Sequence, residues 1–70
     1  MNSGIYCIEN LINGKKYIGQ SSNLNKRKQE HFCDLRKGKH DNYHLQKAFD
    51  KYGENSFKFN IILYFIGKKQ

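Results

Sequence analysis

Two tyrosines, each in a tripeptide with a glycine, are the first residues in this sequence that could take part in chemistry. Tyr6 closes the tripeptide Gly4-Ile5-Tyr6, and Tyr17 opens Tyr17-Ile18-Gly19, with ten residues between the two tyrosines. Tyrosines in a hairpin commonly serve only in packing. Glycine weakens a strand, however, and it usually marks a place where another backbone or a ligand comes close. Packing alone is therefore an incomplete account of these tripeptides.

An arginine and a histidine follow at helical spacing. Arg27 and His31 are separated by one helical turn, so they lie on one face of a helix. The guanidinium fork suits two-point binding of a phosphate, although a solvated surface charge is the commoner use of an arginine. His31 fits either a proton carrier or a structural histidine. Phosphate chemistry thus becomes one candidate for this chain.

The sequence predicts three strands, and the first two hold Tyr6 and Tyr17. Residues 3–9 (SGIYCIE) and 15–19 (KKYIG) are rich in β-branched and aromatic residues. Asn13-Gly14 between them is a strong two-residue hairpin signal, because both residues can adopt positive φ. A loop over residues 10–14 is the alternative, so the register stays open. Residues 57–66 (FKFNIILYFI) are almost wholly apolar, which predicts a third strand buried on both faces.

Two helices are predicted between the second and third strands. Residues 24–37 contain no Gly, Pro or β-branched residue, and they lie between possible caps at 22–23 and Gly38. A second helix, capped at 41–42, carries one apolar stripe made of Leu45, Ala48, Phe49 and Tyr52. The order β-β-α-α-β predicts an α+β domain, a three-stranded sheet with flanking helices.

Composition narrows the function further. The chain has 70 residues, enough for one small domain, and its 13 Lys+Arg against 6 Asp+Glu give a formal net charge of +7. Such an excess is typical of a protein that binds a polyanion such as nucleic acid. Neither a membrane span nor an N-terminal signal peptide is evident, so we expect a cytoplasmic protein with no membrane partner. Cys7 and Cys33 form no CxxC pair and are expected to be reduced thiols; a zinc site with two histidines is the alternative.

Together these residues resemble the GIY-YIG nuclease family. The resemblance covers residues 3 to about 63: GIY at 4–6, YIG at 17–19, Arg27 and His31 on the following helix, and then a set of later positions, Leu45, Gln46, Phe49, Tyr52 and Gly53. It is strongest to the N-terminal catalytic modules of phage and intron homing endonucleases, and weaker to the excision-repair nuclease. It implies metal-dependent hydrolysis of a DNA phosphodiester in a phage or bacterial setting, by a monomer whose sequence specificity comes from another domain.

The resemblance also implies roles for particular residues. Tyr6 and Tyr17 would line the site, one of them as general base or as the group that orients the attacking water. Arg27 would hold the scissile phosphate, with help from Gly19, Lys15 and Lys16, and His31 would assist the tyrosine. A tyrosine has an ordinary pKa of about 10, so a base role needs nearby cations or Mg²⁺ to stabilise the phenolate.

One part of the family pattern is absent from this sequence. Family members carry a glutamate, the protein ligand of Mg²⁺, on a helix after the third strand, and no Asp or Glu of this chain follows residue 57. Two helices also cover only part of an apolar third strand. We therefore expect the metal ligand and a further helix to lie beyond Gln70, so that residues 1–70 form a truncated catalytic domain.

Two consequences follow for function. We expect residues 1–70 alone to cleave DNA poorly or not at all, because Mg²⁺ usually needs a carboxylate ligand. The alternatives from other classes are a catalytically inert basic module that binds DNA and a small RNA- or protein-binding domain whose tyrosines only pack or stack.

Overall fold

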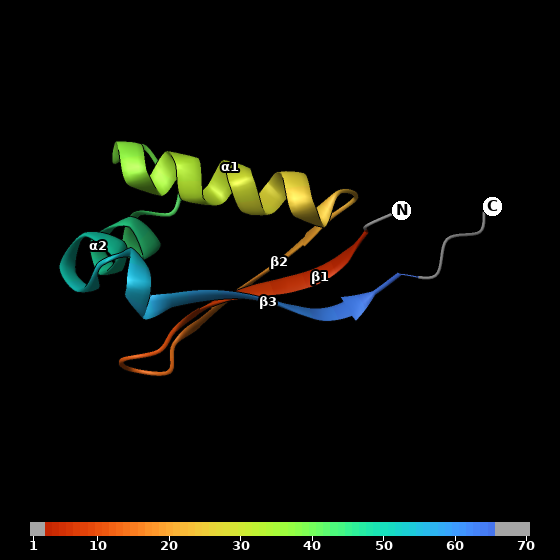
Figure 1. Cartoon of the computed structure of the whole chain (residues 1–70), viewed down its shortest axis with the longest axis horizontal. Helices are drawn as coiled ribbons and strands as arrows, with labels where there is room; N and C mark the ends of the chain where they lie inside the picture. The colour runs from red at the N-terminus through yellow and green to blue at the C-terminus, as the bar shows by residue number, and fades with distance from the viewer. Residues whose placement is uncertain (1–2, 66–70) are drawn as a thin grey trace.

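The computed structural model describes residues 3–65, and its elements follow the predicted order. They are β1 (Gly4–Asn10), β2 (Lys16–Ser21), α1 (Leu24–Lys37), α2 (Tyr43–Tyr52), the short 3-10 helix η1 (Glu54–Ser56) and β3 (Phe57–Tyr64). The three strands form one antiparallel sheet in the order β2-β1-β3 (Figure 1). The predicted α+β fold is confirmed. Neither helix of the described part is long and apolar enough to cross a membrane.

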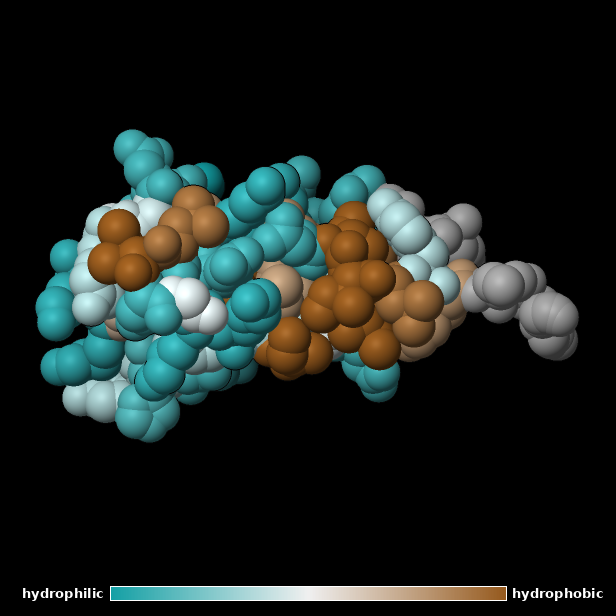
Figure 2. Space-filling view, turned by 90° about the horizontal axis from the view of Figure 1, so that it is seen from below, coloured by the Kyte–Doolittle hydropathy of each residue, from teal (hydrophilic) through white to brown (hydrophobic). Residues whose placement is uncertain are grey.

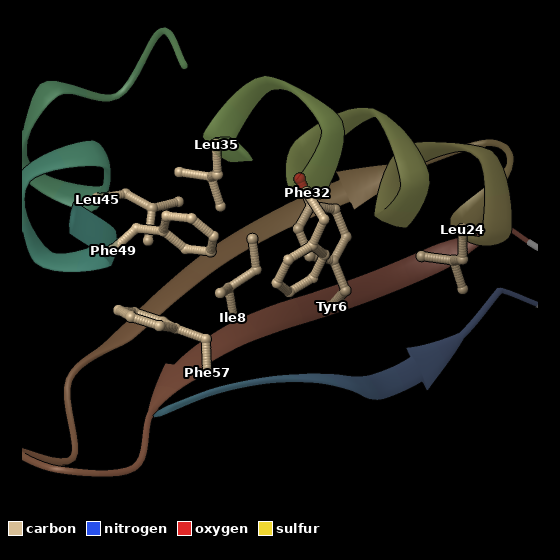
Figure 3. Close-up of a cluster of buried hydrophobic side chains, with 8 residues drawn as sticks. All are labelled: Tyr6, Ile8, Leu24, Phe32, Leu35, Leu45, Phe49 and Phe57. Carbon is tan, nitrogen blue, oxygen red and sulfur yellow. The ribbon is translucent and has the colours of Figure 1, made fainter. Parts of the chain in front are cut away.

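Both helices lie on the same side of the sheet and enclose the core with it. In Figure 1, α1 runs along the sheet and α2 lies near its hairpin end, whereas β1 begins and β3 ends at the opposite end. The buried apolar side chains come from both layers (Figure 3), and they are Tyr6, Ile8, Leu24, Phe32, Leu35, Leu45, Phe49 and Phe57. The Tyr6 side chain is therefore part of the core that is packed between the sheet and α1.

Each helix begins at an asparagine, which settles the open choice of caps. The side chain of Asn23 accepts a hydrogen bond from the backbone N–H of Lys26, and that of Asn42 accepts one from Leu45. α1 ends at Gly38, whose φ of 73° is the left-handed conformation that favours glycine. The cap at Asn23 and the glycine at Gly38 thus fix where α1 begins and ends.

The hairpin has a five-residue loop that begins and ends one residue later than the predicted alternative over residues 10–14. A two-residue turn of the predicted kind needs positive φ at both Asn13 and Gly14. Gly14 has a φ of 77°, but the φ of Asn13 is not positive, so the prediction of a two-residue turn was wrong. The loop spans residues 11–15, and the backbone N–H of Gly14 donates to the carbonyl of Asn10 at 2.8 Å. The buried Asn10 side chain also accepts a hydrogen bond from Ile12 and so begins the turn.

The prediction that the last strand is buried on both faces was also wrong. β3 is an edge strand, and the strand with paired neighbours on both sides is β1, whose Cys7 and Ile8 are both buried on opposite faces. Only Phe57 of β3 is buried, while Ile62 and Leu63 are about half exposed. Figure 2, which views the molecule from the side away from the helices, shows apolar side chains gathered over this part of the sheet. The predicted Ile66 lies outside the described residues.

Candidate active site

Tyr6 lies at the centre of the sheet and faces α1. Its side chain is only 5% exposed, and its ring stacks on Phe59 of β3 with centroids 4.9 Å apart. On the other neighbouring strand, Tyr6 pairs with Gly19. A Cβ on Gly19 would overlap the Tyr6 ring and its hydroxyl. The glycine of the second tripeptide thus makes room for the tyrosine of the first.

The glycine of the first tripeptide has a related reason. A Cβ on Gly4 would overlap the carbonyl oxygen of Leu63, because the β3 backbone comes very close to β1 at this point. Immediately after Gly4, the pairing of β1 with β3 shifts register between Ile5 and Tyr6, which is the signature of a β-bulge. Bulges commonly re-aim a side chain next to a functional site. The expectation that these glycines mark close approaches is confirmed.

His31 meets Tyr6 from α1. It follows Leu24 by two helical turns and precedes Leu35 by one, so it lies on the buried stripe of the helix. Its Nε2 is 2.5 Å from the Tyr6 hydroxyl. Burial, followed by the nearby positive charge of Arg27 and by His40, lowers the pKa of His31 to about 4. The imidazole is therefore neutral near pH 7.

Arg27 lies one turn before His31 on the same helix face. It is half-buried, and its Nη1 forms an ion pair with Glu30 at 3.1 Å. Burial pulls the pKa of Arg27 down, but the neighbouring Glu30 and Tyr6 more than offset this effect and leave the pKa raised. A permanent positive charge thus stands beside the Tyr6 hydroxyl. Arg27 and His31 lie on one face of α1, as their spacing had led us to expect.

His40 completes the group, and the sequence offered no signal for it. It lies in the loop between the helices, where its Nε2 is 2.6 Å from Nδ1 of His31, and the two rings meet edge to edge with their planes inclined by 18°. Burial is the main cause that lowers the pKa of His40. Tyr6, His31 and His40 form one hydrogen-bonded row, with Arg27 at its side.

The other predicted site residues lie apart from this row. Tyr17 is half-buried, packs against the core, and lines a groove with α2. Lys15 lines the same groove. Lys16 precedes Tyr17 and so points to the opposite face of the sheet, where it pairs with Glu9 at 3.8 Å. Contacts therefore join Tyr6 to Gly19, His31 and Arg27, whereas Tyr17 and Lys15 line the groove and Lys16 lies on the opposite face of the sheet.

The groove beside Tyr17 is strongly basic. It has a volume of about 530 Å³ and lies between the hairpin and α2. Its lining consists of lysines, aromatic and polar side chains and one acid, namely Asn13, Lys15, Tyr17, His44, Lys47, Ala48, Asp50, Lys51 and Tyr52. The acid, Asp50, accepts a hydrogen bond from Gln46. Three lysines with no ion-pair partner among residues 3–65 give the groove a net positive charge.

The groups around Tyr6 do not fit a magnesium ion on their own. Mg²⁺ prefers oxygen ligands and usually at least one carboxylate. The nitrogens of His31 and His40 are already committed to hydrogen bonds, and the carboxylate of Glu30 is held by Arg27. Within residues 3–65, no three His, Cys, Asp or Glu side chains converge as metal ligands, and Cys7 and Cys33 are free.

Comparison with known proteins gives consistent matches. Residues 2–70 match the GIY-YIG catalytic domain family. The chain is 45% identical over 62 residues to "Intron-associated endonuclease 1" of Enterobacteria phage T4, an alignment that covers 89% of this chain and 25% of that protein. It is 42% identical over 62 residues to "Probable intron-encoded endonuclease 1" of Neurospora crassa, over 89% of this chain and 19% of that protein. The chain thus spans a quarter or less of the length of these relatives.

Solved structures agree with the sequence matches. The catalytic domain of homing endonuclease I-TevI superposes with a TM-score of 0.86 at 39% identity, over 96% of this chain and 72% of that one. A mutant of the same catalytic domain gives 0.85 at 43% identity, over 93% of this chain and 66% of that one. With two glycine-tyrosine tripeptides meeting in the sheet and a family match along nearly its whole length, this chain belongs to the GIY-YIG family and has the fold of its catalytic domain.

Proposed function

We propose that this domain hydrolyses phosphodiester bonds of DNA, with Tyr6, Arg27 and His31 at the reaction centre. The observation that carries the proposal is the environment of the Tyr6 hydroxyl, which is in contact with His31 and next to the charge of Arg27. A phenol between a hydrogen-bond partner and a cation is suited to react as the phenolate. The names of the relatives, all endonucleases, support the same reaction class.

Arg27 is the group for the phosphate. Its side chain is 40% exposed, so the guanidinium can reach a substrate while Glu30 holds it. A phosphate would replace or share the Glu30 contact, and the guanidinium would stabilise the negative charge that grows on the phosphoryl oxygens in the transition state. Tyr6, as phenolate, would take a proton from the attacking water or orient it.

A divalent cation is implied for this family, and its ligand is not supplied by the described residues. When bound, such an ion would polarise a phosphoryl oxygen and stabilise the leaving oxygen. We propose that its carboxylate comes from a segment outside residues 3–65. The roles given to Tyr6, His31 and Arg27 do not depend on where that ligand lies.

DNA on either side of the scissile bond would follow the basic groove along α2. Lys15, Lys47 and Lys51 are in position to contact phosphates, and the overall charge of +7 favours any polyanion. Contacts of this kind carry no sequence information. We therefore propose that specificity comes from another part of the protein, in accord with the much greater length of the relatives. We also propose that the protein is a monomer and that it is cytoplasmic. The free thiols of Cys7 and Cys33 accord with a reducing compartment.

A second candidate is a basic module that binds DNA without cutting it. The feature that favours it is that no three His, Cys, Asp or Glu side chains among residues 3–65 converge as metal ligands. Both candidates predict DNA binding, but only the first predicts turnover once a metal ligand is supplied.

A nicking assay on supercoiled plasmid with Mg²⁺ separates the two candidates. The chain would be assayed alone and as a graft in which it replaces the matching segment of the phage T4 relative. We expect little or no nicking by the chain alone and Mg²⁺-dependent nicking by the graft. A folded graft that binds plasmid but leaves it intact would favour the inert module, and robust turnover by the chain alone would contradict our expectation about the metal ligand.

A further inference from the structure

The row formed by Tyr6, His31 and His40 continues to a fourth group, a backbone amide. The N–H of Asn42 donates to Nδ1 of His40 at 3.0 Å. The two preceding contacts, at 2.6 Å between the imidazoles and 2.5 Å to the Tyr6 hydroxyl, each join atoms that could donate or accept. A backbone N–H can only donate. The Asn42 amide is therefore the one member of the row whose role is fixed.

That fixed donor determines every hydrogen position along the row. Nδ1 of His40 must present a lone pair to Asn42, so neutral His40 carries its hydrogen on Nε2. His40 then donates to Nδ1 of His31, which leaves the His31 hydrogen on Nε2. His31 in turn donates to the oxygen of Tyr6.

We propose that the Asn42 backbone N–H sets the direction of this row, so that His31 is a constant hydrogen-bond donor to Tyr6 and His40 is the positioning residue that holds it in that tautomer. His31 consequently cannot receive the phenol proton of Tyr6, which must point away from α1. On the proposed function, His31 stabilises the phenolate rather than removing the proton. The direction itself rests on geometry alone.

The same geometry requires both histidines to be neutral. A proton added to His40 would lie on Nδ1 against the Asn42 N–H, and one added to His31 would lie on Nδ1 against the Nε2–H of His40. Among the charged groups around the pair, Arg27 opposes protonation, whereas the carboxylates favour it, namely Glu30, Asp34 and Asp41. The lowered pKa of each histidine agrees with the neutral row.

The loop that carries His40 and Asn42 is itself fixed by Gln46. The amide oxygen of this buried side chain accepts the N–H of His40 at 3.0 Å, and its nitrogen donates to the carbonyl of Leu35 and to Asp50. Gln46 thereby joins the end of α1, the loop and α2. The Asn42 amide is held in line by this support and by its place at the start of α2.

Two substitutions at one position isolate the Asn42 N–H. Asn42→Ala and Asn42→Pro both remove the side chain that caps α2, but only proline also removes the N–H donor. The φ of Asn42, −83°, is close to the range that proline adopts. Nitrogen-15 NMR of the imidazole rings, recorded near pH 7.5 on the 70-residue chain, reports the tautomer of each histidine directly.

In the unsubstituted chain and in Asn42→Ala we expect both His31 and His40 to carry hydrogen only on Nε2. In Asn42→Pro we expect His31 to populate the Nδ1–H form and the pKa of His40 to rise. A His31 or His40 that carries hydrogen on Nδ1 in the unsubstituted chain would overturn the proposal, and this arm holds even if the proline variant does not fold. Identical tautomers and pKa values in folded Ala and Pro variants would also overturn it. None of these outcomes depends on DNA cleavage.

Discussion

At the scale of single residues, the site depends on how closely Tyr6 is enclosed. Its ring has Phe59 on one side, no side chain at Gly19 on the other, and His31 at its hydroxyl. A displacement of the ring away from His31 by more than about 1 Å would break the hydrogen bond to His31. The position of the hydroxyl is therefore set by packing before any substrate arrives.

Gly19→Ala tests this enclosure. The added Cβ overlaps the Tyr6 ring, so we expect the ring to move away from His31 and the free energy of unfolding to fall by roughly 1–3 kcal/mol, as in other overpacked cores. Urea denaturation and the NMR signals of His31 would measure the two effects. Gln20→Ala, at the neighbouring exposed position, is the control and should change stability by less than about 0.5 kcal/mol. Equal behaviour of the two variants would remove the packing role of Gly19.

The lowered pKa of His31 predicts a pH dependence of stability. The unfolded chain binds a proton at His31 near pH 6.5, but the folded chain does so only near pH 4. The unfolded state thus holds more protons in this window, and the free energy of unfolding should fall as the pH drops from about 6.5 to 4. Urea midpoints measured across this range should show the slope in the unsubstituted chain and a flatter one in His31→Gln. The exposed His44→Gln is the control; an unchanged slope in His31→Gln would contradict the assignment.

Residue types and spacing identified part of this site in advance. Arg27 and His31 could be placed on one helix face because the helical period alone relates them, and the two glycines signalled close approaches. His40 could not be predicted, since the loop that brings it to His31 has no periodicity and is fixed only by Gln46 and the packing of α2. The strand alternation could have excluded Lys16, because a residue next to Tyr17 must point to the other face.

At the scale of elements, β1 and α1 supply the groups that we propose to react, and α2 supplies their support. β1 is enclosed by both other strands, and this fixes Tyr6, while α1 presents Arg27 and His31 one turn apart. The asparagine caps and Gly38 made the helix limits predictable. The order of the strands was not predictable from local pattern: Phe57–Tyr64 is more apolar than Gly4–Asn10, yet it is the edge strand. Long-range pairing decides which strand becomes central.

The basic groove along α2 yields a prediction about salt. If Lys47 and Lys51 contact DNA phosphates, replacing both with alanine should reduce the slope of log affinity against log salt by about 0.9 for each lost contact. Fluorescence anisotropy with a short duplex at several salt concentrations would measure this slope. As a control, Lys37 and Lys39 would both be replaced with alanine. They do not line the groove, and their replacement removes the same charge, so the slope should change less. Equal losses would mean that only the net charge matters.

At the scale of the whole molecule, the surface has a basic groove and a separate group of exposed apolar side chains. The row of Tyr6, His31 and His40 lies between the sheet and the helices, and the lysine groove lies between the hairpin and α2. Ile18 and Leu63 are exposed, and Figure 2 shows apolar side chains gathered on the face away from the helices, beside hydrophilic ones. The sequence predicted the incomplete cover of β3, although it also predicted burial of this strand on both faces, which β3 does not have. The lysine groove is the surface that meets the requirements of a nucleic-acid substrate.

The central claim is that the Tyr6 hydroxyl, beside Arg27, is the reacting group of this domain. The most direct test is the single-turnover rate of plasmid nicking by the graft with the phage T4 relative, compared with the same graft carrying Tyr6→Phe. Phenylalanine keeps the ring that packs on Phe59 and removes only the hydroxyl. The buried His31 then loses its hydrogen-bond partner, so the free energy of unfolding should fall by about 1–3 kcal/mol, and circular dichroism would establish that the variant graft is folded at the assay temperature. We expect the nicking rate to fall by at least about 100-fold, the usual contribution of a general base. A Tyr6→Phe graft that nicks at the rate of the unsubstituted graft would contradict the account.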